Sequence, residues 1–276
     1  MALVLDICSK FAAKVRQFFE MYKIYCEKLA HVPFLSYLCG MKRRIYVFDL
    51  GGVLIKLNVG RCMRAFEALM GEANMRAVLG MDAHGEGVKA VSIATKQLMA
   101  DFERGLISSE DFLTEVQAFC RPDTTKEAIT EAWMAMLDEL PAERLAFVDA
   151  LRAKGHKVYL LSNGNDLHFE FINRTYGLNT HFDGMFLSQK MHMAKPEEPI
   201  FRAVDDAIRV DAETDAICPT PETEVFFIDD IETNRRAAET FVHWTTFSSL
   251  SDVAVSEHFP SGKQPMPYDN SRIAVG

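Results

Sequence analysis

The chain has 276 residues and a formal net charge of -9, from 30 basic and 39 acidic side chains. It is 49% hydrophobic and 25% charged, an ordinary globular composition that can bury a core. The acidic balance argues weakly against nucleic acid as a partner, because nucleic-acid-binding proteins usually present a basic face. A small phosphorylated substrate is not excluded. The six cysteines contain no C-x-x-C pair, which gives zinc or dithiol redox sites no support and favours a reducing compartment such as the cytoplasm.

Residues 1–40 are apolar but repeatedly interrupted by charged side chains, which predicts an amphipathic helix from about Leu3 to Ala30 that ends near Pro33. No apolar run here approaches the roughly 18 residues of a membrane span, and no basic region precedes an apolar block as in a signal peptide. Three interpretations remain: a helix that docks on this protein, a partner or a second copy; an interfacial anchor; or translated sequence upstream of a true start at Met41. We favour the first or the third.

The first expected strand is Ile45–Phe48, an apolar run that leads directly into Asp49 and two glycines. Continuous apolar runs of this length are typical of buried parallel strands. From residue 59 to residue 140 the apolar spacing becomes helical instead. Four stretches there are predicted to be helices: RCMRAFEALM, VSIATKQLMADFERG, SSEDFLTEVQAFC and KEAITEAWMAMLDEL.

The rest of the chain alternates between strands and helices. Strands are expected in KVYLLSNGN, FDGMFLS, EVFFIDD and HWTTF, and helices in PAERLAFVDALRAKG, DLHFEFINRTYG, KPEEPIFRAVDDAIRV and IETNRRAAETF. This alternation predicts an α/β fold with an open, Rossmann-like parallel sheet sandwiched by helices. Residues 41–58 and 141–259 would form this core, residues 59–140 an inserted all-helical domain, and residues 260–276 a flexible tail.

Polar side chains gather where the predicted strands end. In open parallel sheets the ligand site lies beyond these carboxyl ends. The residues concerned are Asp49, Ser162, Asn163, Asp229 and Asp230, with Lys195 in the loop before a helix.

These residue types suit phosphoryl transfer. A carboxylate can act as a nucleophile, and further carboxylates beside it would repel it unless a cation lay among them. Mg²⁺ prefers such oxygen ligands. A serine hydroxyl and backbone N–H groups can hold phosphate oxygens, and a lysine can neutralise the charge of the transferring group.

The stretches VFDLGGVL, YLLSNGN, MAKPEEPIF and VFFIDDIETN resemble, in order and spacing, the four motifs of the haloacid dehalogenase-like hydrolases. The resemblance spans about Arg44 to Phe247. Four motifs in order, each at a strand end or helix entrance, are far more specific than one. Within the family the chain is most similar to the sugar-phosphate phosphatases of the glucose-1-phosphate type, which carry a small helical cap after the first motif.

The resemblance implies a role for each matching position. It makes Asp49 the nucleophile and a metal ligand, and it gives the metal the backbone carbonyl of Gly51. Asp230 would bind Mg²⁺ directly, and Asp229 directly or through water. The phosphate would be held by Ser162, by backbone amides at Asn163 and Gly164, and by Lys195, with Asn234 supporting the loop.

One position departs from the family pattern. Most phosphatases of the family have an acidic residue, the acid–base catalyst, where this chain has Gly51. Such a group is worth about 10²–10⁴-fold in rate. Either another group replaces it or the substrate has a good leaving group. The candidates are His84, Glu86, Glu103, His168 and His192, and the sequence does not choose among them.

The expected activity is therefore Mg²⁺-dependent hydrolysis of a small phosphomonoester through an aspartyl-phosphate. One alternative is a 2-haloacid dehalogenase, which needs no metal; the acid pair Asp229–Asp230 argues against it. The other is a non-catalytic binder of a phosphorylated ligand, suggested by Gly51 and opposed by the intact Asp49, Lys195 and Asp230.

Overall fold

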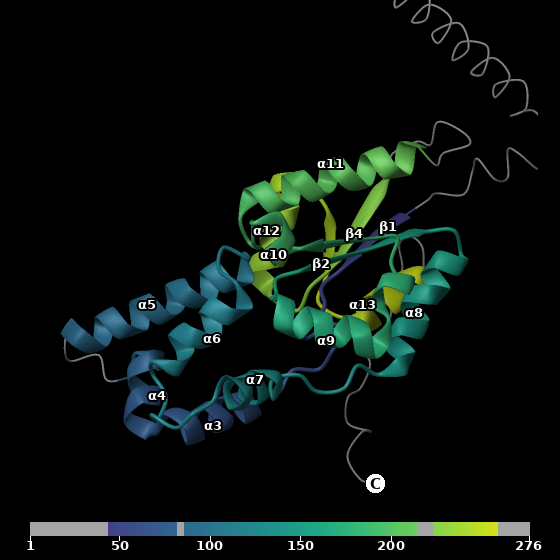
Figure 1. Cartoon of the computed structure of the whole chain (residues 1–276). Coiled ribbons are helices and arrows are strands. Elements are labelled where there is room, and N and C mark those ends of the chain that lie inside the picture. Colours follow the sequence, from purple (N-terminus) through teal and green to yellow (C-terminus); the bar gives the residue numbers. More distant parts are fainter. Residues whose placement is uncertain (1–43, 82–85, 215–222, 259–276) are drawn as a thin grey trace, which may run out of the picture.

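The computed structural model describes residues 44–81, 86–214 and 223–258 (Figure 1). The predicted N-terminal helix and the tail from residue 260 lie outside these ranges. Within them, no helix is both long and apolar enough to cross a membrane.

The core is one sheet of five parallel strands in the order β3-β2-β1-β4-β5. Its strands are β1 (Arg44–Phe48), β2 (Lys157–Ser162), β3 (Gly184–Leu187), β4 (Glu224–Ile228) and β5 (Thr245–Phe247). The central strand β1 pairs with both β2 and β4, so that Val47 lies opposite Tyr159 on one side and Phe227 on the other. The predicted Rossmann-like parallel sheet is confirmed.

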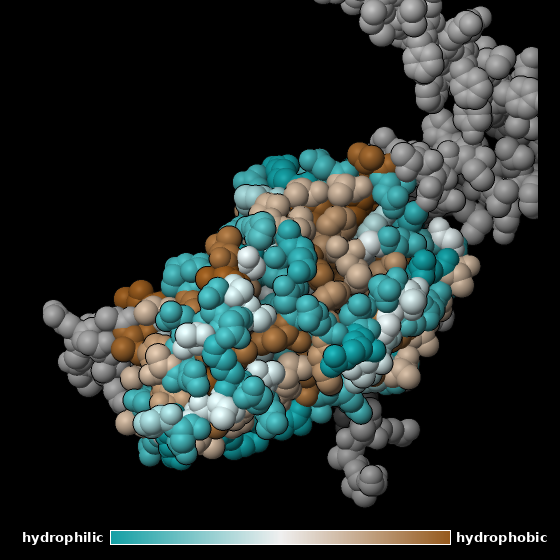
Figure 2. Space-filling model, in the orientation of Figure 1, coloured by the Kyte–Doolittle hydropathy of each residue, from teal (hydrophilic) through white to brown (hydrophobic). Residues whose placement is uncertain are grey.

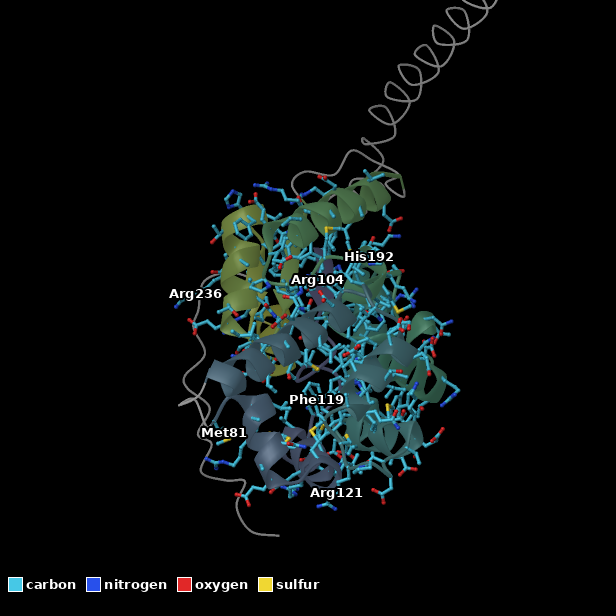
Figure 3. The ribbon with its side chains drawn as sticks, turned by 60° about the vertical axis from the view of Figure 1, so that its left-hand side comes forward. Met81, Arg104, Phe119, Arg121, His192 and Arg236 are labelled. Atoms are coloured by element: carbon cyan, nitrogen blue, oxygen red, sulfur yellow. The ribbon has the colours of Figure 1, made fainter. Side chains whose placement is uncertain are left out.

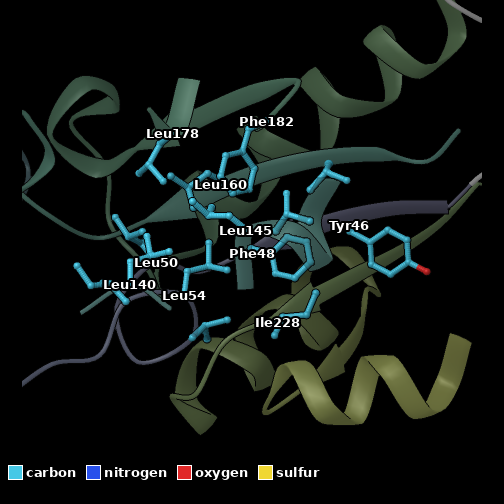
Figure 4. Packing of buried hydrophobic residues seen from close by; sticks show 14 of the residues in the cluster. Tyr46, Phe48, Leu50, Leu54, Leu140, Leu145, Leu160, Leu178, Phe182 and Ile228 are labelled. Carbon is cyan, nitrogen blue, oxygen red and sulfur yellow. The ribbon is translucent and has the colours of Figure 1, made fainter. Parts of the chain in front are cut away.

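Helices cover both faces of the sheet. The alternation along β1 explains why both faces need cover, because Tyr46 and Phe48 pack on one side and Ile45 and Val47 on the other. The first side, seen closely in Figure 4, is covered by α8 (Ala142–Ala153), α9 (Asp166–Tyr176) and α13 (Leu250–His258). The second side is covered by α11 (Glu198–Thr214) and α12 (Glu232–Val242).

A helical insertion separates β1 from the rest of the core and lies beside the carboxyl ends of the strands (Figure 1). Its helices are α3 (Val59–Met70), α4 (Glu72–Leu79), α5 (Glu86–Glu103), α6 (Ser109–Gln117) and α7 (Lys126–Met134). They share a hydrophobic cluster of their own around Phe112 and Trp133. Whether the insertion behaves as a separate cap domain stays a prediction.

The insertion differs from the sequence prediction in two places. The sequence prediction contains no helix at α4, which has only eight residues and none that is fully buried. Its half-buried Met75 and Val78 pack against the hydrophobic cluster of the insertion. The helix expected to run to Leu140 ends at Met134. Beyond it, the segments that enter and leave the insertion pair with each other: Leu57 and Leu137 form an antiparallel bridge, and the Lys56 backbone exchanges hydrogen bonds with Asp138 and Glu139.

Figure 2 shows a largely hydrophilic surface on which hydrophobic residues appear at several places, one of them the outer end of the insertion. Exposed large hydrophobic side chains of the insertion include Leu79, Met81 and Ile93.

Helix α11 offers a matched test of the core. Val204 is fully buried against the sheet, whereas Val210 on the same helix is 62% exposed. We expect Val204→Ala to lower the free energy of unfolding by about 2 kcal/mol, because two buried methyl groups are lost. Val210→Ala should change it by less than about 0.5 kcal/mol. Urea unfolding measures both, and equal losses would contradict the packing described for α11.

Candidate active site

The ends of β2, β1 and β4, three neighbouring strands, bring the predicted site residues together. Asp49 directly follows β1, Ser162 ends β2, and Asp229 and Asp230 follow β4. Lys195 comes from the loop between α10 (Ser188–Met191) and α11. Residues far apart in sequence therefore meet at one edge of the sheet, where parallel folds place their ligands.

Lys195 lies at the centre of this group and is almost completely buried. Its Nζ is 3.0 Å from Asp49 Oδ1 and 2.7 Å from Asp229 Oδ2, and it donates a further hydrogen bond of 2.9 Å to the carbonyl of Leu161. Two carboxylates and a carbonyl thus occupy the three donors of the ammonium group.

Burial and charge oppose each other at Asp49. Desolvation is the largest effect and raises the pKa of its carboxyl, and the charge of Asp229 acts in the same direction. Lys195 lowers the pKa, and the result is a value of about 6. Desolvation also acts to lower the pKa of Lys195, but the two carboxylates outweigh it and raise that pKa above its usual value. Lys195 therefore stays charged and favours the ionised form of Asp49, which is the form a nucleophile requires.

Asp229 is fully buried, and protein groups occupy the hydrogen-bonding positions of its carboxylate. Its Oδ1 accepts hydrogen bonds from the Ile231 N–H at 2.8 Å and the Asn234 amide at 3.2 Å. Its Oδ2 accepts from Lys195 at 2.7 Å and from Asn234 at 3.0 Å. These four bonds fill the roughly four lone-pair positions of a carboxylate. Asp229 therefore holds Lys195 in place, and the Asn234 amide donates to both of its carboxylate oxygens.

Asp49, Asp229 and Asp230 form a possible metal site, with one carboxylate oxygen from each lying within 4.8 Å of the others. This all-oxygen set fits a hard divalent cation. Because Asp229 is engaged by its neighbours, Asp49 and the exposed Asp230 are the acids better placed to bind directly. Asp230 also explains Gly52, whose φ is +76° and whose Cβ, if it had one, would lie 2.3 Å from Asp230 Oδ2.

The loop after β2 supplies the predicted phosphate-binding groups, and some of them already have partners. The Asn163 side chain donates to the Lys195 carbonyl at 2.8 Å and accepts from the Lys195 N–H at 2.9 Å. The Gly164 N–H donates to the Ser188 hydroxyl at 3.0 Å. Among the described residues, the Ser162 hydroxyl makes only a long contact of 3.4 Å, to the Asn163 carbonyl. It is therefore the side chain of this loop best able to meet a phosphate.

A cavity of about 210 Å³ lies between this edge of the sheet and the insertion. The core lines it with Gly51 and the loop after β2, and the insertion lines it with apolar side chains that include Met99 and Trp133. Glu103, His168 and Gln189 also line it. A phosphate near Ser162 would thus have its organic part in a largely apolar space closed by the insertion.

The five candidates for the missing acid fall into different places. His84 lies outside the described residues, as does the side chain of Glu86. His192 is exposed, and its Nδ1 contacts the Arg104 carbonyl at 2.8 Å. Only His168 and Glu103 border the cavity among the described parts of the chain.

His168 has no free ring nitrogen. Its Nε2 lies 3.0 Å from the Trp133 carbonyl, which can only accept, so this nitrogen carries the proton. Its Nδ1 then accepts from the Asn165 amide at 3.3 Å. The ring stacks on Trp133, and burial lowers the pKa of His168. The residue therefore anchors the insertion to α9 as a neutral histidine.

Sequence reasoning did not single out Gln189. Gln189 is the second residue after the end of β3 and lies in α10, and no motif marks it. The rule that led to Asp49 and Ser162 could have found it, because β3 ends at the same edge of the sheet.

Comparison with known proteins gives a consistent result. A family model for haloacid dehalogenase-like hydrolases matches residues 44–240. The D-ribitol-5-phosphate phosphatase of Bacteroides thetaiotaomicron is 28% identical over 163 residues, which cover 56% of this chain and 72% of the relative.

Two solved structures are similar over most of their length. One is a HAD family enzyme from Bacteroides thetaiotaomicron, in complex with magnesium and inorganic phosphate, with a TM-score of 0.59 and 28% identity over 75% of this chain and 93% of that one. The other is a predicted HAD-like family hydrolase from Porphyromonas gingivalis, with a TM-score of 0.59 and 28% identity over 80% of this chain and all of that one (100%).

The burial of Lys195 leads to a stability prediction. Lys195→Met would leave two buried carboxylates without their cation, so we expect the free energy of unfolding to fall by about 3 kcal/mol or more at neutral pH. Loss of the ammonium group removes the one nearby charge that lowers the pKa of Asp49, so this pKa rises further above its value in the unfolded state. The folded variant then binds more protons, and the deficit should shrink as the pH falls towards about 5.

The matched control is Lys190→Met, because Lys190 pairs with Asp166 while its side chain is 61% exposed. Exposed pairs contribute about 1 kcal/mol at most. Urea unfolding at both pH values tests the prediction, and a Lys195→Met deficit no larger than that of Lys190→Met would contradict it.

Proposed function

Because this chain belongs to the haloacid dehalogenase-like hydrolases, we propose that it is a Mg²⁺-dependent phosphatase that hydrolyses a small phosphomonoester, such as a sugar or sugar-alcohol phosphate. The observation that carries the proposal is the buried contact of Asp49 with Lys195, beside the carboxylates of Asp229 and Asp230. A sugar-alcohol phosphatase among the relatives and a similar structure holding magnesium and phosphate support it.

In the proposed reaction Asp49 attacks the phosphorus atom and forms an aspartyl-phosphate, which water then hydrolyses. Lys195 keeps Asp49 ionised and offsets negative charge beside it. The Ser162 hydroxyl donates to a phosphate oxygen. Asp49 and Asp230, with the backbone carbonyl of Gly51, would hold Mg²⁺, which neutralises charge on the transferring phosphoryl group.

We infer that the insertion acts as a cap over the site. Its apolar side chains close the cavity over the organic part of the substrate, which excludes water and selects the leaving group. A substrate with an apolar surface as well as hydroxyl groups fits a lining that includes Met99 and Trp133. The scattered cysteines, of which Cys62 and Cys120 are free thiols, support a reducing, cytoplasmic setting.

The two alternatives fit the site less well. A dehalogenase needs no metal, yet three carboxylates are clustered here and the single ammonium group of Lys195 offsets only one of their three charges. A non-catalytic binder has no need of a nucleophile kept ionised by a buried ammonium group.

We expect phosphate release from a panel of sugar, sugar-alcohol and nitrophenyl phosphates with Mg²⁺, and none with chelator until Mg²⁺ is restored. Asp49→Asn should lower the rate at least about a thousandfold, because the nucleophile is lost. Asp206→Asn, which changes an exposed aspartate on α11, should leave it unchanged. Halide release from haloacids without metal would favour the dehalogenase. No turnover of any compound by the folded, metal-loaded protein would favour the binder.

A further inference from the structure

We propose that Glu103 is the acid–base catalyst of this site and donates to the leaving oxygen the proton that Gly51 cannot supply. The proposal rests on the phosphatase function above. It assigns to the insertion, and not to the core, the group that completes the reaction.

The backbone around Glu103 is fixed against the core. Glu103 is the last residue of α5, and its carbonyl accepts a hydrogen bond of 2.5 Å from the Ser188 hydroxyl. The next carbonyl, of Arg104, contacts His192, and both residues are labelled in Figure 3. Gly105 has a φ of +63°, and a Cβ on it would lie 2.1 Å from the Gln189 carbonyl. Only glycine allows this close approach.

This anchoring keeps the Glu103 side chain at the cavity. The same cavity borders Gly51, where the acid is absent, and Ser162, the proposed phosphate contact. The one other titratable side chain among its described lining residues is His168, whose two ring nitrogens are engaged. Position and elimination therefore both select Glu103.

The surroundings of Glu103 suit proton donation. Burial raises the pKa of its carboxyl, and the smaller effect of Arg104 acts in the opposite direction. Its carboxyl accepts no hydrogen bond from the residues that the structure describes. Burial and the lack of such partners both favour the protonated form of this carboxyl, which can pass its proton to a developing alkoxide.

The proposed steps balance as follows. Asp49 forms a bond to phosphorus while the bond from phosphorus to the leaving oxygen breaks, and that oxygen takes the Glu103 proton to become an alcohol. Water then attacks the aspartyl-phosphate, and its proton passes to the Glu103 carboxylate. Inorganic phosphate leaves, and Asp49 and Glu103 return to their starting forms.

A leaving-group series tests this role. We expect Glu103→Gln to lower kcat/KM for propyl phosphate by about 10²–10⁴-fold, because an alkoxide needs a proton to depart. For para-nitrophenyl phosphate the loss should stay below about tenfold, because nitrophenolate leaves without one. The parameter kcat/KM is measured because it includes the step in which the leaving group departs. Glutamine is the substitution because it preserves the size of the side chain.

Two further variants keep the outcomes separate. Glu110→Gln, at an exposed position of the insertion, should have no effect on either substrate. Equal losses on both substrates, or no loss on either, would overturn the role of Glu103 and leave the phosphatase intact. If the wild type and Asp49→Asn release phosphate equally, the proposed function itself fails.

A separate observation concerns Gln189. The nitrogen and the oxygen of its side-chain amide are both buried and have no hydrogen-bond partner among the described residues. A buried amide without partners is costly, so natural proteins seldom keep one without a use. Gln189 Oε1 and Ser162 Oγ lie 4.0 and 3.9 Å from the position that a Cβ on Gly164 would take. The amide thus borders the proposed phosphate position within the same cavity.

We infer that Gln189 binds a hydroxyl group of the substrate close to its phosphoester. Gln189→Leu should lower kcat/KM for glycerol phosphate about tenfold and that for propyl phosphate much less, since the latter has no hydroxyl to lose. The same variant should unfold at an unchanged or higher urea concentration, because an unpaired amide is removed. Gln97→Leu, at an exposed position of α5, is the control. Equal losses on the two substrates, or no loss on either, would overturn the inference.

Discussion

The buried ammonium group of Lys195 is the contact on which the site depends. It joins the ends of β1 and β4 through Asp49 and Asp229, and it reaches β2 through the Leu161 carbonyl. Three carboxylates and one ammonium group leave two negative charges at this edge of the sheet when all are ionised. A divalent cation would balance that charge, so the electrostatics of the protein alone favour a metal among these acids.

The sheet was largely predictable because each buried strand is a short apolar run, and because a parallel strand buried on both faces has little choice of residue. The insertion was less predictable. Helix α4 has eight residues and only the half-buried Met75 and Val78 facing the hydrophobic cluster, so its apolar pattern is short and weak. The end of α7 depends on pairing between Leu57 and Leu137, which are 80 positions apart, and local spacing carries no information about such a contact.

The site could be predicted as a set of residues, but not as a set of roles. Asp49, Ser162, Asp229 and Asp230 follow from the rule that ligands lie beyond strand ends, and Lys195 from its place in the motif MAKPEEPIF. The sequence does not show that Asp229 is fully engaged in holding Lys195, or that the Gly164 N–H is already paired with Ser188. These partners come from loops whose course is set by tertiary packing. Gln189 escaped notice for the same reason, since its unpaired amide has meaning only inside the cavity.

The attachment at Gly105 has a consequence for the order of events. If the insertion swings away to admit substrate, it turns on the paired segments at Leu57 and Leu137 and carries Glu103 with it. The open enzyme would then have a nucleophile but no proton donor. It would not hydrolyse phosphoesters that reach Asp49 without closure of the insertion. Closure of the insertion would bring the Glu103 carboxyl to the site and complete it. The insertion would have to open again to release the products. Opening and closing of the insertion would then be part of every turnover, beside the steps of bond cleavage.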